Sequence, residues 1–246
     1  MAHSTGRLNI RRVEELCKVM SDLKNAGNEL ILVSSGAIGM GIGKLALDGK
    51  PSDIPTKQAA AAVGQCELMY VYDKLFSEYN HAVAQILITG EDIEHSFRRE
   101  NFENTMRRLL ELGVLPIVNE NDSIATDEIE IGDNDTLGAI VATTLDADLL
   151  IILSDIDGLF TADPKSDSTA KLLDKVTEIT PEIEEMTGGV GSKFGTGGMA
   201  TKIKAAKMAT EKGVDMVIAN GKNPEILYDI LKGKNVGTRF ISGKGK

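Results

Sequence analysis

The chain has 246 residues, of which 42% are apolar, and a net charge of −10 at neutral pH. This length is enough for a sizeable core in one large α/β domain or two small lobes. The acidic balance argues against nucleic acid as a partner, and no apolar run approaches the roughly 20 residues that span a bilayer, so we expect a cytoplasmic protein without membrane attachment.

Five apolar runs of strand length recur along the chain without alternating polar residues, which is typical of strands buried on both faces. They are Leu30–Val33, Val83–Ile88, Val114–Val118, Leu149–Leu153 and Met216–Ala219. Helical patterns lie between them, roughly over Val13–Asn25, Thr56–Tyr79, Arg98–Leu112, Asp135–Thr144, Ala200–Lys212 and Pro224–Leu231. This alternation predicts an α/β fold, a three-layer αβα sandwich around a mostly parallel central sheet.

The cysteines and histidines form no metal-ligand pattern. Cys17 shares an apolar helix face with Val13 and Met20, and Cys66 lies in an Ala-rich helical stretch, so we expect both to be small buried hydrophobes. The three histidines are isolated from one another and from the cysteines. Any metal ion is therefore expected to arrive with a substrate.

A polar turn follows each predicted strand. The turns are Ser34-Ser35-Gly36, Thr89-Gly90, Asn119-Glu120-Asn121-Asp122, Ser154-Asp155 and Asn220-Gly221. Turns favour such residues in any protein. In open α/β sheets, however, ligands bind outside the carboxyl ends of the strands. We therefore expect these turns to converge on one edge of the sheet and to form a binding site.

A glycine-rich segment, Gly195–Lys202, leads into a helix that we expect to begin near Met199. Glycines let the backbone approach a phosphate, and the first N–H groups of a helix carry partial positive charge. Lys202, in the first turn, can reach the same anion. The alternative is a flexible linker with a solvated lysine, and the spacing does not match a Walker A loop.

Two acidic loops, Asn119–Asp122 and Gly132–Asp135, flank Ile124–Ile131, whose second half alternates and predicts a small β-hairpin flap. The return of the hairpin would bring the loops together and supply acceptors for an ammonium group. A Ca²⁺ site lacks the EF-hand spacing, and two solvated turns are the bland alternative.

Two further strand ends offer binding groups. Ser34-Ser35-Gly36 can hold a carboxylate or phosphate through hydroxyl and N–H donors, whereas no nucleophile elbow surrounds these serines. Leu153–Pro164 can line a nucleotide pocket or merely turn the chain.

Four motifs of the chain resemble those of the amino-acid kinase family, in particular of its glutamate-phosphorylating branch. In chain order they are Asn-Glu-Asn-Asp, Gly-Asp-Asn-Asp, Ser-Asp-Ile-Asp-Gly-Leu-Phe-Thr-Ala-Asp-Pro and Gly-Thr-Gly-Gly-Met-Ala-Thr-Lys. The resemblance covers Arg7–Phe240. The resemblance implies ATP-dependent phosphorylation of the γ-carboxylate of L-glutamate to L-glutamyl 5-phosphate, the first step of proline biosynthesis. It implies a single kinase domain with a substrate-binding lobe over 1–147 and a nucleotide-binding lobe over 148–246.

Carried over residue by residue, the resemblance implies that Ser35, Asp122 and Asn134 bind glutamate. It makes Lys202 and Asp135 the catalytic pair, in which Lys202 neutralises the transferred phosphoryl group and Asp135 orders neighbouring lysines and substrate. The implied ATP-binding residues are Ser154, Asp155, Thr196, Gly197, Gly198, Met199, Ala200, Thr201 and Lys202. Mg²⁺ is expected to come with the nucleotide.

The resemblance also implies a homo-oligomer, a dimer or tetramer, with proline as a feedback inhibitor and a glutamyl-phosphate reductase as a partner. It implies the single-domain form, without the RNA-modifying-enzyme-like module that many members carry.

Family members begin with a Val-Val-Lys-x-Gly-Ser strand whose lysine reaches the ATP phosphates, and Met1–Gly6 contains no such motif. We therefore expect near-background kinase activity from the chain as written. Two alternatives are a sibling kinase with another carboxylate or carbamate acceptor and a catalytically impaired nucleotide- or amino-acid-binding protein.

Overall fold

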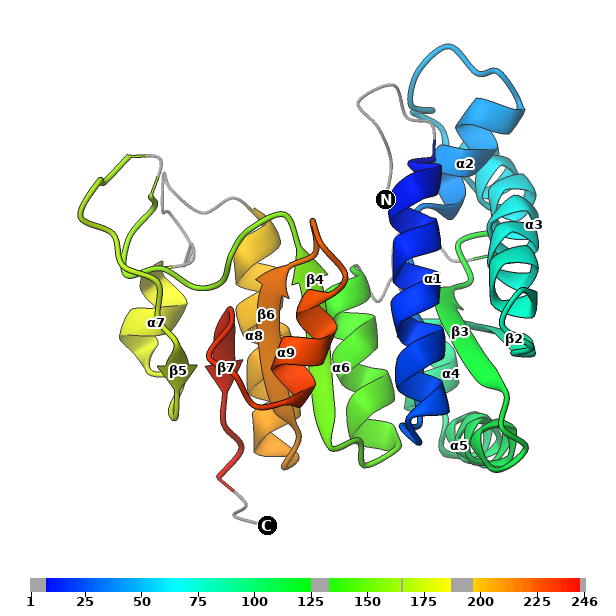
Figure 1. Cartoon of the computed structure of the whole chain (residues 1–246). Coiled ribbons are helices and arrows are strands. Elements are labelled where there is room, and N and C mark those ends of the chain that lie inside the picture. The colour runs from blue at the N-terminus through cyan, green and yellow to red at the C-terminus, as the bar shows by residue number, and fades with distance from the viewer. Residues whose placement is uncertain (1–7, 125–132, 165, 187–196, 244–246) are drawn as a thin grey trace. The chain divides into compact units, whose positions relative to one another are not determined.

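The computed structural model describes residues 8–124, 133–164, 166–186 and 197–243 (Figure 1). It divides into two compact units, Met1–Asn134 and Asp135–Lys246. The predictions for Met1–Gly6 and for nearly all of the hairpin lie outside the described residues. Among the helices of the described part, none is long and apolar enough to cross a membrane.

The first unit holds a parallel sheet in the order β1-β3-β2. Its elements are α1 (Ile10–Asn25), β1 (Leu32–Val33), α2 (Ala37–Lys44), α3 (Ile54–Ser77), β2 (Val83–Ile88), α4 (Gly90–Glu94), α5 (Ser96–Glu111) and β3 (Leu115–Glu120). In the register, Val33 lies opposite Val118 and Ile88 opposite Glu120. The three polar turns that follow these strands therefore leave this sheet at the same edge, whereas the other two predicted turns, after β4 (Leu149–Ser154) and β6 (Asp215–Asn220), belong to a second sheet and not to the single edge that we expected.

Helix α3 forms much of the interior of this unit. It begins at an N-cap, Asp53, whose side chain accepts a hydrogen bond from the Thr56 N–H at 2.9 Å. Leu68, Tyr72 and Phe76, spaced four residues apart, are almost fully buried. This spacing places the three side chains on one face of the helix, so burial of that face holds α3 against the rest of the unit.

Helix α2 was not predicted. Its sequence contains three glycines, Gly39, Gly41 and Gly43, and glycine disfavours an isolated helix by about 1 kcal/mol per residue. Tertiary packing against α3 compensates, because Gly41 and Gly64 allow the two backbones to come into close contact.

The second unit holds a sheet in the order β4-β6-β7-β5, parallel except for the β6–β7 pair. Its elements are α6 (Asn134–Thr144), which starts at the last residue of the first unit, β4 (Leu149–Ser154), β5 (Lys175–Val176), α7 (Pro181–Met186), α8 (Gly197–Glu211), β6 (Asp215–Asn220), α9 (Ile226–Leu231) and β7 (Thr238–Phe240).

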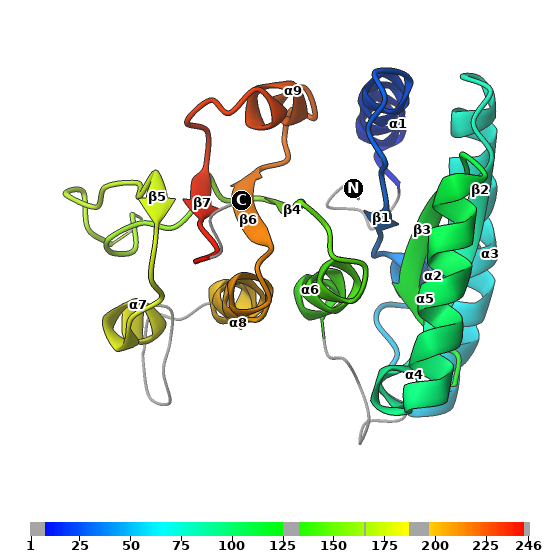
Figure 2. The same ribbon diagram turned by 90° about the horizontal axis from the view of Figure 1, so that it is seen from below.

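This second sheet has helices on both faces, with α6 and α8 on one side and α9 on the other (Figure 2). Met216 and Ile218 of β6 pack in the core formed with α6 and α8, while Val217 and Ala219 pack with Ile230 of α9. Both faces are apolar because both are covered, which explains the unbroken apolar run of β6.

The predicted α/β class with mostly parallel strands is confirmed, but the described strands form two hydrogen-bonded sheets instead of one central sheet. Along the sequence, the first compact unit ends at Asn134, before the lobe boundary that was expected after residue 147. The reason is that Ala139 and Ala142 of α6 belong to the core of the second unit. A helix follows the core that buries its apolar face.

Asp215, at the start of β6, binds Arg239 of β7 and Ser242, which follows that strand. Its carboxylate accepts hydrogen bonds from the N–H and hydroxyl of Ser242, both at 2.9 Å, and from the guanidinium of Arg239 at 3.2 and 3.3 Å. Burial alone would raise the pKa of Asp215, but the Ser242 hydrogen bonds and Arg239 outweigh it and hold the pKa below its ordinary value.

We expect Asp215→Asn to lower the free energy of unfolding by about 1–2 kcal/mol at pH 7. A carboxyl whose pKa is lowered by folding stabilises the protein above its unfolded pKa, about 3.9, and loses this effect as the pH falls through its folded pKa. Urea denaturation between pH 7 and pH 3 should therefore show the gap between wild type and variant closing below about pH 4. A gap that stays constant over this range would contradict the ionic role.

Candidate functional site

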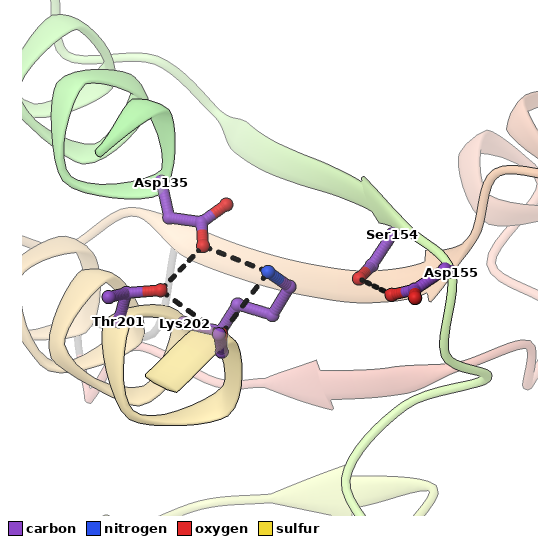
Figure 3. A network of polar contacts seen from close by, with 6 residues as sticks. Asp135, Ser154, Asp155, Thr201 and Lys202 are labelled. Carbon is purple, nitrogen blue, oxygen red and sulfur yellow. Dashed lines mark hydrogen bonds and ion pairs between the residues drawn. The ribbon is translucent and has the colours of Figure 1, made fainter. Parts of the chain in front are cut away.

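Lys202 and Asp135 form an ion pair in the second unit. The Nζ of Lys202, on α8, lies 2.9 Å from Oδ2 of Asp135, in the first turn of α6. The same carboxylate oxygen accepts a hydrogen bond from the Thr201 hydroxyl at 2.9 Å (Figure 3). The side chains of Lys202 and Asp135 are 12% and 18% exposed. This geometry brings together the two side chains predicted as the catalytic pair, although the sequence separates them widely.

The start of α8 holds this lysine in place. Lys202 Nζ also donates to the Gly198 carbonyl at 3.3 Å, and this carbonyl oxygen lies 3.0 Å from the Thr201 hydroxyl, as an alternative acceptor to Asp135. The helix begins at Gly197, not near Met199, so Lys202 lies in its second turn and its side chain reaches back toward the N-terminus. A cation at this position can meet an anion bound at the first N–H groups of the helix.

The other predicted ATP-binding residues of this segment differ in what they can offer. Thr196 lies outside the described residues. A Cβ at Gly198 would meet nothing within 4 Å, so its backbone is open to a ligand. Met199 packs its side chain against the hydrophobic core, and Ala200 carries no polar side-chain group. Only the backbone of these two residues could therefore contact a phosphate.

Ser154 and Asp155 lie at the end of β4, and the Ser154 hydroxyl donates to Asp155 Oδ1 at 3.2 Å (Figure 3). The parallel neighbour β6 ends beside them, where Gly221 N–H donates to the Ser154 carbonyl at 2.8 Å. Asn220 then donates to Asp157 Oδ1 at 2.7 Å. These polar groups line the carboxyl edge of the second sheet, which is where an open α/β sheet binds its ligands.

Of the residues predicted to bind glutamate, Asn134 and the Ser34-Ser35 turn meet in the first unit. The Asn134 side-chain amide donates to the Ser34 carbonyl at 3.0 Å. Ser35 is exposed directly after this contact, and Gly36, with φ of 103°, adopts the left-handed conformation that starts α2. The turn therefore presents Ser35 outward at the carboxyl end of β1.

Asp122 lines a cavity of about 420 Å³ in the first unit. Glu120, Asn121 and Ser123 share its wall with Ala37, two residues after Ser35, and with side chains of α3 and β2. A volume of this order accommodates a small amino acid. Carboxylates in the wall favour a ligand that carries an ammonium group over a ligand that is only anionic.

Sequence reasoning missed several polar residues around this cavity. Gln65 of α3 accepts a hydrogen bond from Asn119 at 3.0 Å and donates to Gln85 of β2 at 3.3 Å. Gln65 and Asn119 are buried, and a glutamine directly after an Ala-rich stretch of the helix is the signal that could have identified the first. Buried amide groups satisfy one another's hydrogen bonds, so this series of hydrogen-bonded side chains fixes the cavity wall.

The two cysteines differ from each other. Cys17 is buried, as predicted, and burial raises the pKa of its thiol to about 12, so it is an inert core residue. Cys66 is exposed and lines the cavity, which corrects the expectation of a buried hydrophobe.

The sequence is similar to known proteins along its whole length. A model of the amino acid kinase family matches residues 2–220. The chain is 55% identical to the glutamate 5-kinase of Clostridium perfringens, and the match covers 100% of this chain and 93% of that protein. It is 50% identical to the glutamate 5-kinase of Listeria innocua, with 99% of this chain and 90% of that protein covered.

Solved structures show the same fold at lower identity. A carbamate kinase from Giardia lamblia bound to AMP-PNP superposes with a TM-score of 0.67 at 18% identity, over 95% of this chain and 90% of that chain. The isopentenyl phosphate kinase of T. acidophilum superposes with a TM-score of 0.63 at 19% identity, over 96% and 92%.

Proposed function

The chain belongs to the amino acid kinase family, and we propose that it transfers the γ-phosphoryl group of ATP to the γ-carboxylate of L-glutamate. The observation that carries this proposal is the 55% identity, along the whole chain, to a glutamate 5-kinase. The product is L-glutamyl 5-phosphate, which enters proline biosynthesis. The Lys202–Asp135 pair and the acidic cavity supply the chemistry that this reaction requires.

The acceptor needs no general base. A glutamate γ-carboxyl group has a pKa of about 4.3, so at neutral pH it is already an anionic nucleophile. The obstacle is the repulsion between this carboxylate and the ATP phosphates. Cations and N–H groups that neutralise the transferred phosphoryl group, together with in-line placement of the reactants, overcome it.

Lys202 is the described residue best suited to neutralise that charge. Its ammonium is largely buried, and it is held by Asp135 and the Gly198 carbonyl, so little reorganisation is needed when phosphate arrives. Asp135 orients the lysine, and Thr201 fixes the carboxylate in turn. The open backbone at Gly198 offers N–H groups to the same phosphates.

Mg²⁺ accompanies ATP in most phosphoryl transfers and would neutralise part of the charge on its phosphates. Within the described ranges, no group of three or more His, Cys, Asp or Glu side chains is placed to hold a metal ion. Such an ion would be held mainly by the nucleotide, and no step of this mechanism runs through a protein-bound metal.

The acidic cavity sets the class of acceptor. Glu120 and Asp122 can accept hydrogen bonds from the α-ammonium group of an amino acid, while Ser35 and nearby backbone N–H groups can donate to a carboxylate. Uridylate lacks an ammonium group and would meet two carboxylates there. This favours glutamate over the nucleotide acceptors of sibling kinases.

However slow its turnover, the chain is expected to release ADP in a coupled assay only when ATP and glutamate are both present, and Asp122→Ala to raise the KM for glutamate about 10–100-fold. The reason is the loss of a charge-assisted hydrogen bond to the ammonium group. The KM for ATP should stay within about twofold. The control is Asp73→Ala, which removes an exposed carboxylate from α3.

Equal loss of glutamate and ATP affinity in Asp122→Ala would instead show a structural role for this residue. Calorimetry with glutamate and a non-hydrolysable ATP analogue separates the alternatives. Binding of both without turnover would identify a catalytically impaired binding protein, and turnover of another carboxylate or carbamate without glutamate binding would identify a sibling kinase.

Three features of the biological context complete the proposal. An acyl phosphate hydrolyses readily, so a glutamyl-phosphate reductase would consume the product close to where it forms. Proline, the end product, would act as the feedback inhibitor of a homo-oligomer. ATP and glutamate are both available in the cytoplasm, where the reaction would take place.

A further inference from the structure

We propose that Tyr72 is a positioning residue for the glutamate site: its hydroxyl fixes Ser34, and through Ser34 it fixes Ser35 and Asn134. The proposal rests on the proposed function, because Ser35 and Asn134 are the groups assigned there to glutamate. It adds a residue of α3 that does not itself contact substrate.

Tyr72 is completely buried on the inner face of α3, and its Oη lies 2.8 Å from the Oγ of Ser34, at the carboxyl end of β1. Its ring stacks on Phe76 with centroids 6.3 Å apart, which holds the phenol in one orientation. Ser34 is 1% exposed. A hydrogen bond between two buried, oriented groups fixes their relative position more firmly than one at the surface.

The hydroxyl of Ser34 has two oxygen neighbours. Its Oγ lies 2.8 Å from the Tyr72 Oη, and either hydroxyl can be the donor in this hydrogen bond. The same Oγ lies 3.4 Å from the Ser35 carbonyl oxygen. Burial raises the pKa of Tyr72 above its ordinary value, so the phenol stays protonated at any working pH. The Tyr72 hydroxyl is therefore linked directly to Ser34 and, through it, to the Ser35 peptide.

The backbone of Ser34 completes the connection. Its N–H donates to the Val118 carbonyl of β3 at 2.9 Å, and its carbonyl accepts from the Asn134 side chain at 3.0 Å. The N–H, the carbonyl and the hydroxyl of Ser34 are thus all engaged, so both its backbone, which orients Asn134, and its side chain are held in place. The Asn134 amide has donated to Ser34, which leaves its side-chain oxygen as the acceptor that can face a glutamate ammonium.

A phenylalanine would fill the space of Tyr72 equally well, so the hydroxyl is the part that serves the turn. We expect Tyr72→Phe to raise the KM for glutamate about five- to tenfold, with kcat and the KM for ATP within about twofold. Ser34→Ala should have the same effect, and the double variant should be no worse than the more affected single variant. Tyr70→Phe is the control, because Tyr70 lies on the same helix with 62% of its surface exposed.

Coupled ADP-release kinetics and amide hydrogen exchange on the full chain test this. Additive single effects, or an unchanged glutamate KM in Tyr72→Phe, would overturn the proposal. A wild type without glutamate-dependent ADP release would overturn the proposed function instead. Hydrogen exchange then decides the positioning role: faster exchange at residues 34–36 in Tyr72→Phe than in Tyr70→Phe supports it, and equal exchange refutes it.

Discussion

Lys202→Met is expected to lower kcat about 10²–10³-fold, with a smaller rise in the KM for ATP and little change in the KM for glutamate. The effect falls on kcat because the charge of the transferred phosphoryl group must be neutralised most strongly in the transition state. Methionine matches the length of the lysine stem and suits a side chain that is only 12% exposed, so the helix should keep its packing.

Steady-state kinetics with a coupled ADP assay measure this, and thermal unfolding checks that the variant is folded. The matched control is Lys204→Met, which makes the same change on the same helix at an exposed position. Lys204→Met should retain wild-type kcat. If both variants lost activity equally, the loss would not be specific to Lys202 and the catalytic role would be contradicted. If Lys202→Met changed only the KM for ATP, Lys202 would be a binding residue and not a catalytic one.

The main helices and strands could be predicted because each has a local signal. The runs before Ser34, Thr89, Asn119, Ser154 and Asn220 are mostly apolar, and the structure places a strand at each. By contrast, α2 is rich in glycine and exists because α3 packs against it, and β7 is a three-residue strand between polar turns. Tertiary contacts decide such elements, and periodicity does not reveal them.

For the candidate site, the sequence supplied the residue types and the family resemblance, which the comparisons confirm. The contacts between these residues could not be derived from spacing. Asp135 pairs with Lys202 across 67 positions, and Asn134 reaches Ser34 across 100. Buried polar partners such as Gln65 and Tyr72 were read as parts of an apolar helix, because a helix pattern shows which face is buried but not which buried group bonds to a distant loop.

Gly64→Ala is expected to cause the largest loss of stability, about 3 kcal/mol or more, because α2 and α3 touch backbone to backbone. A Cβ at Gly64 would lie 1.7 Å from the Ala37 carbonyl oxygen and 2.5 Å from the Gly41 nitrogen. Reciprocally, a Cβ at Gly41 would lie 1.8 Å from the Ala60 carbonyl oxygen. Real Cβ atoms do not come so close to backbone, so either alanine must push the helices apart.

Urea denaturation of Gly64→Ala, Gly41→Ala and the control Gly43→Ala tests this. Gly43 is exposed on α2 and an added Cβ there meets nothing within 4 Å, so alanine should stabilise the helix by up to about 1 kcal/mol. Opposite signs for Gly41→Ala and Gly43→Ala, two residues apart, are the decisive result. Equal small effects would show that the helices separate without cost.

Gly64→Ala should also weaken glutamate binding. The reason is that α2 begins at Ala37, directly after the Ser34–Gly36 turn, and Ala37 lines the same cavity as Asp122. Displacing the Ala37 carbonyl moves the turn that presents Ser35. In urea-free buffer, at a temperature where Gly64→Ala is still folded, its KM for glutamate should rise while the KM for ATP is unchanged, since the residues that we propose to bind ATP belong to the other unit. A variant that is destabilised with normal glutamate affinity would show that the turn is held by Tyr72 and β3 alone.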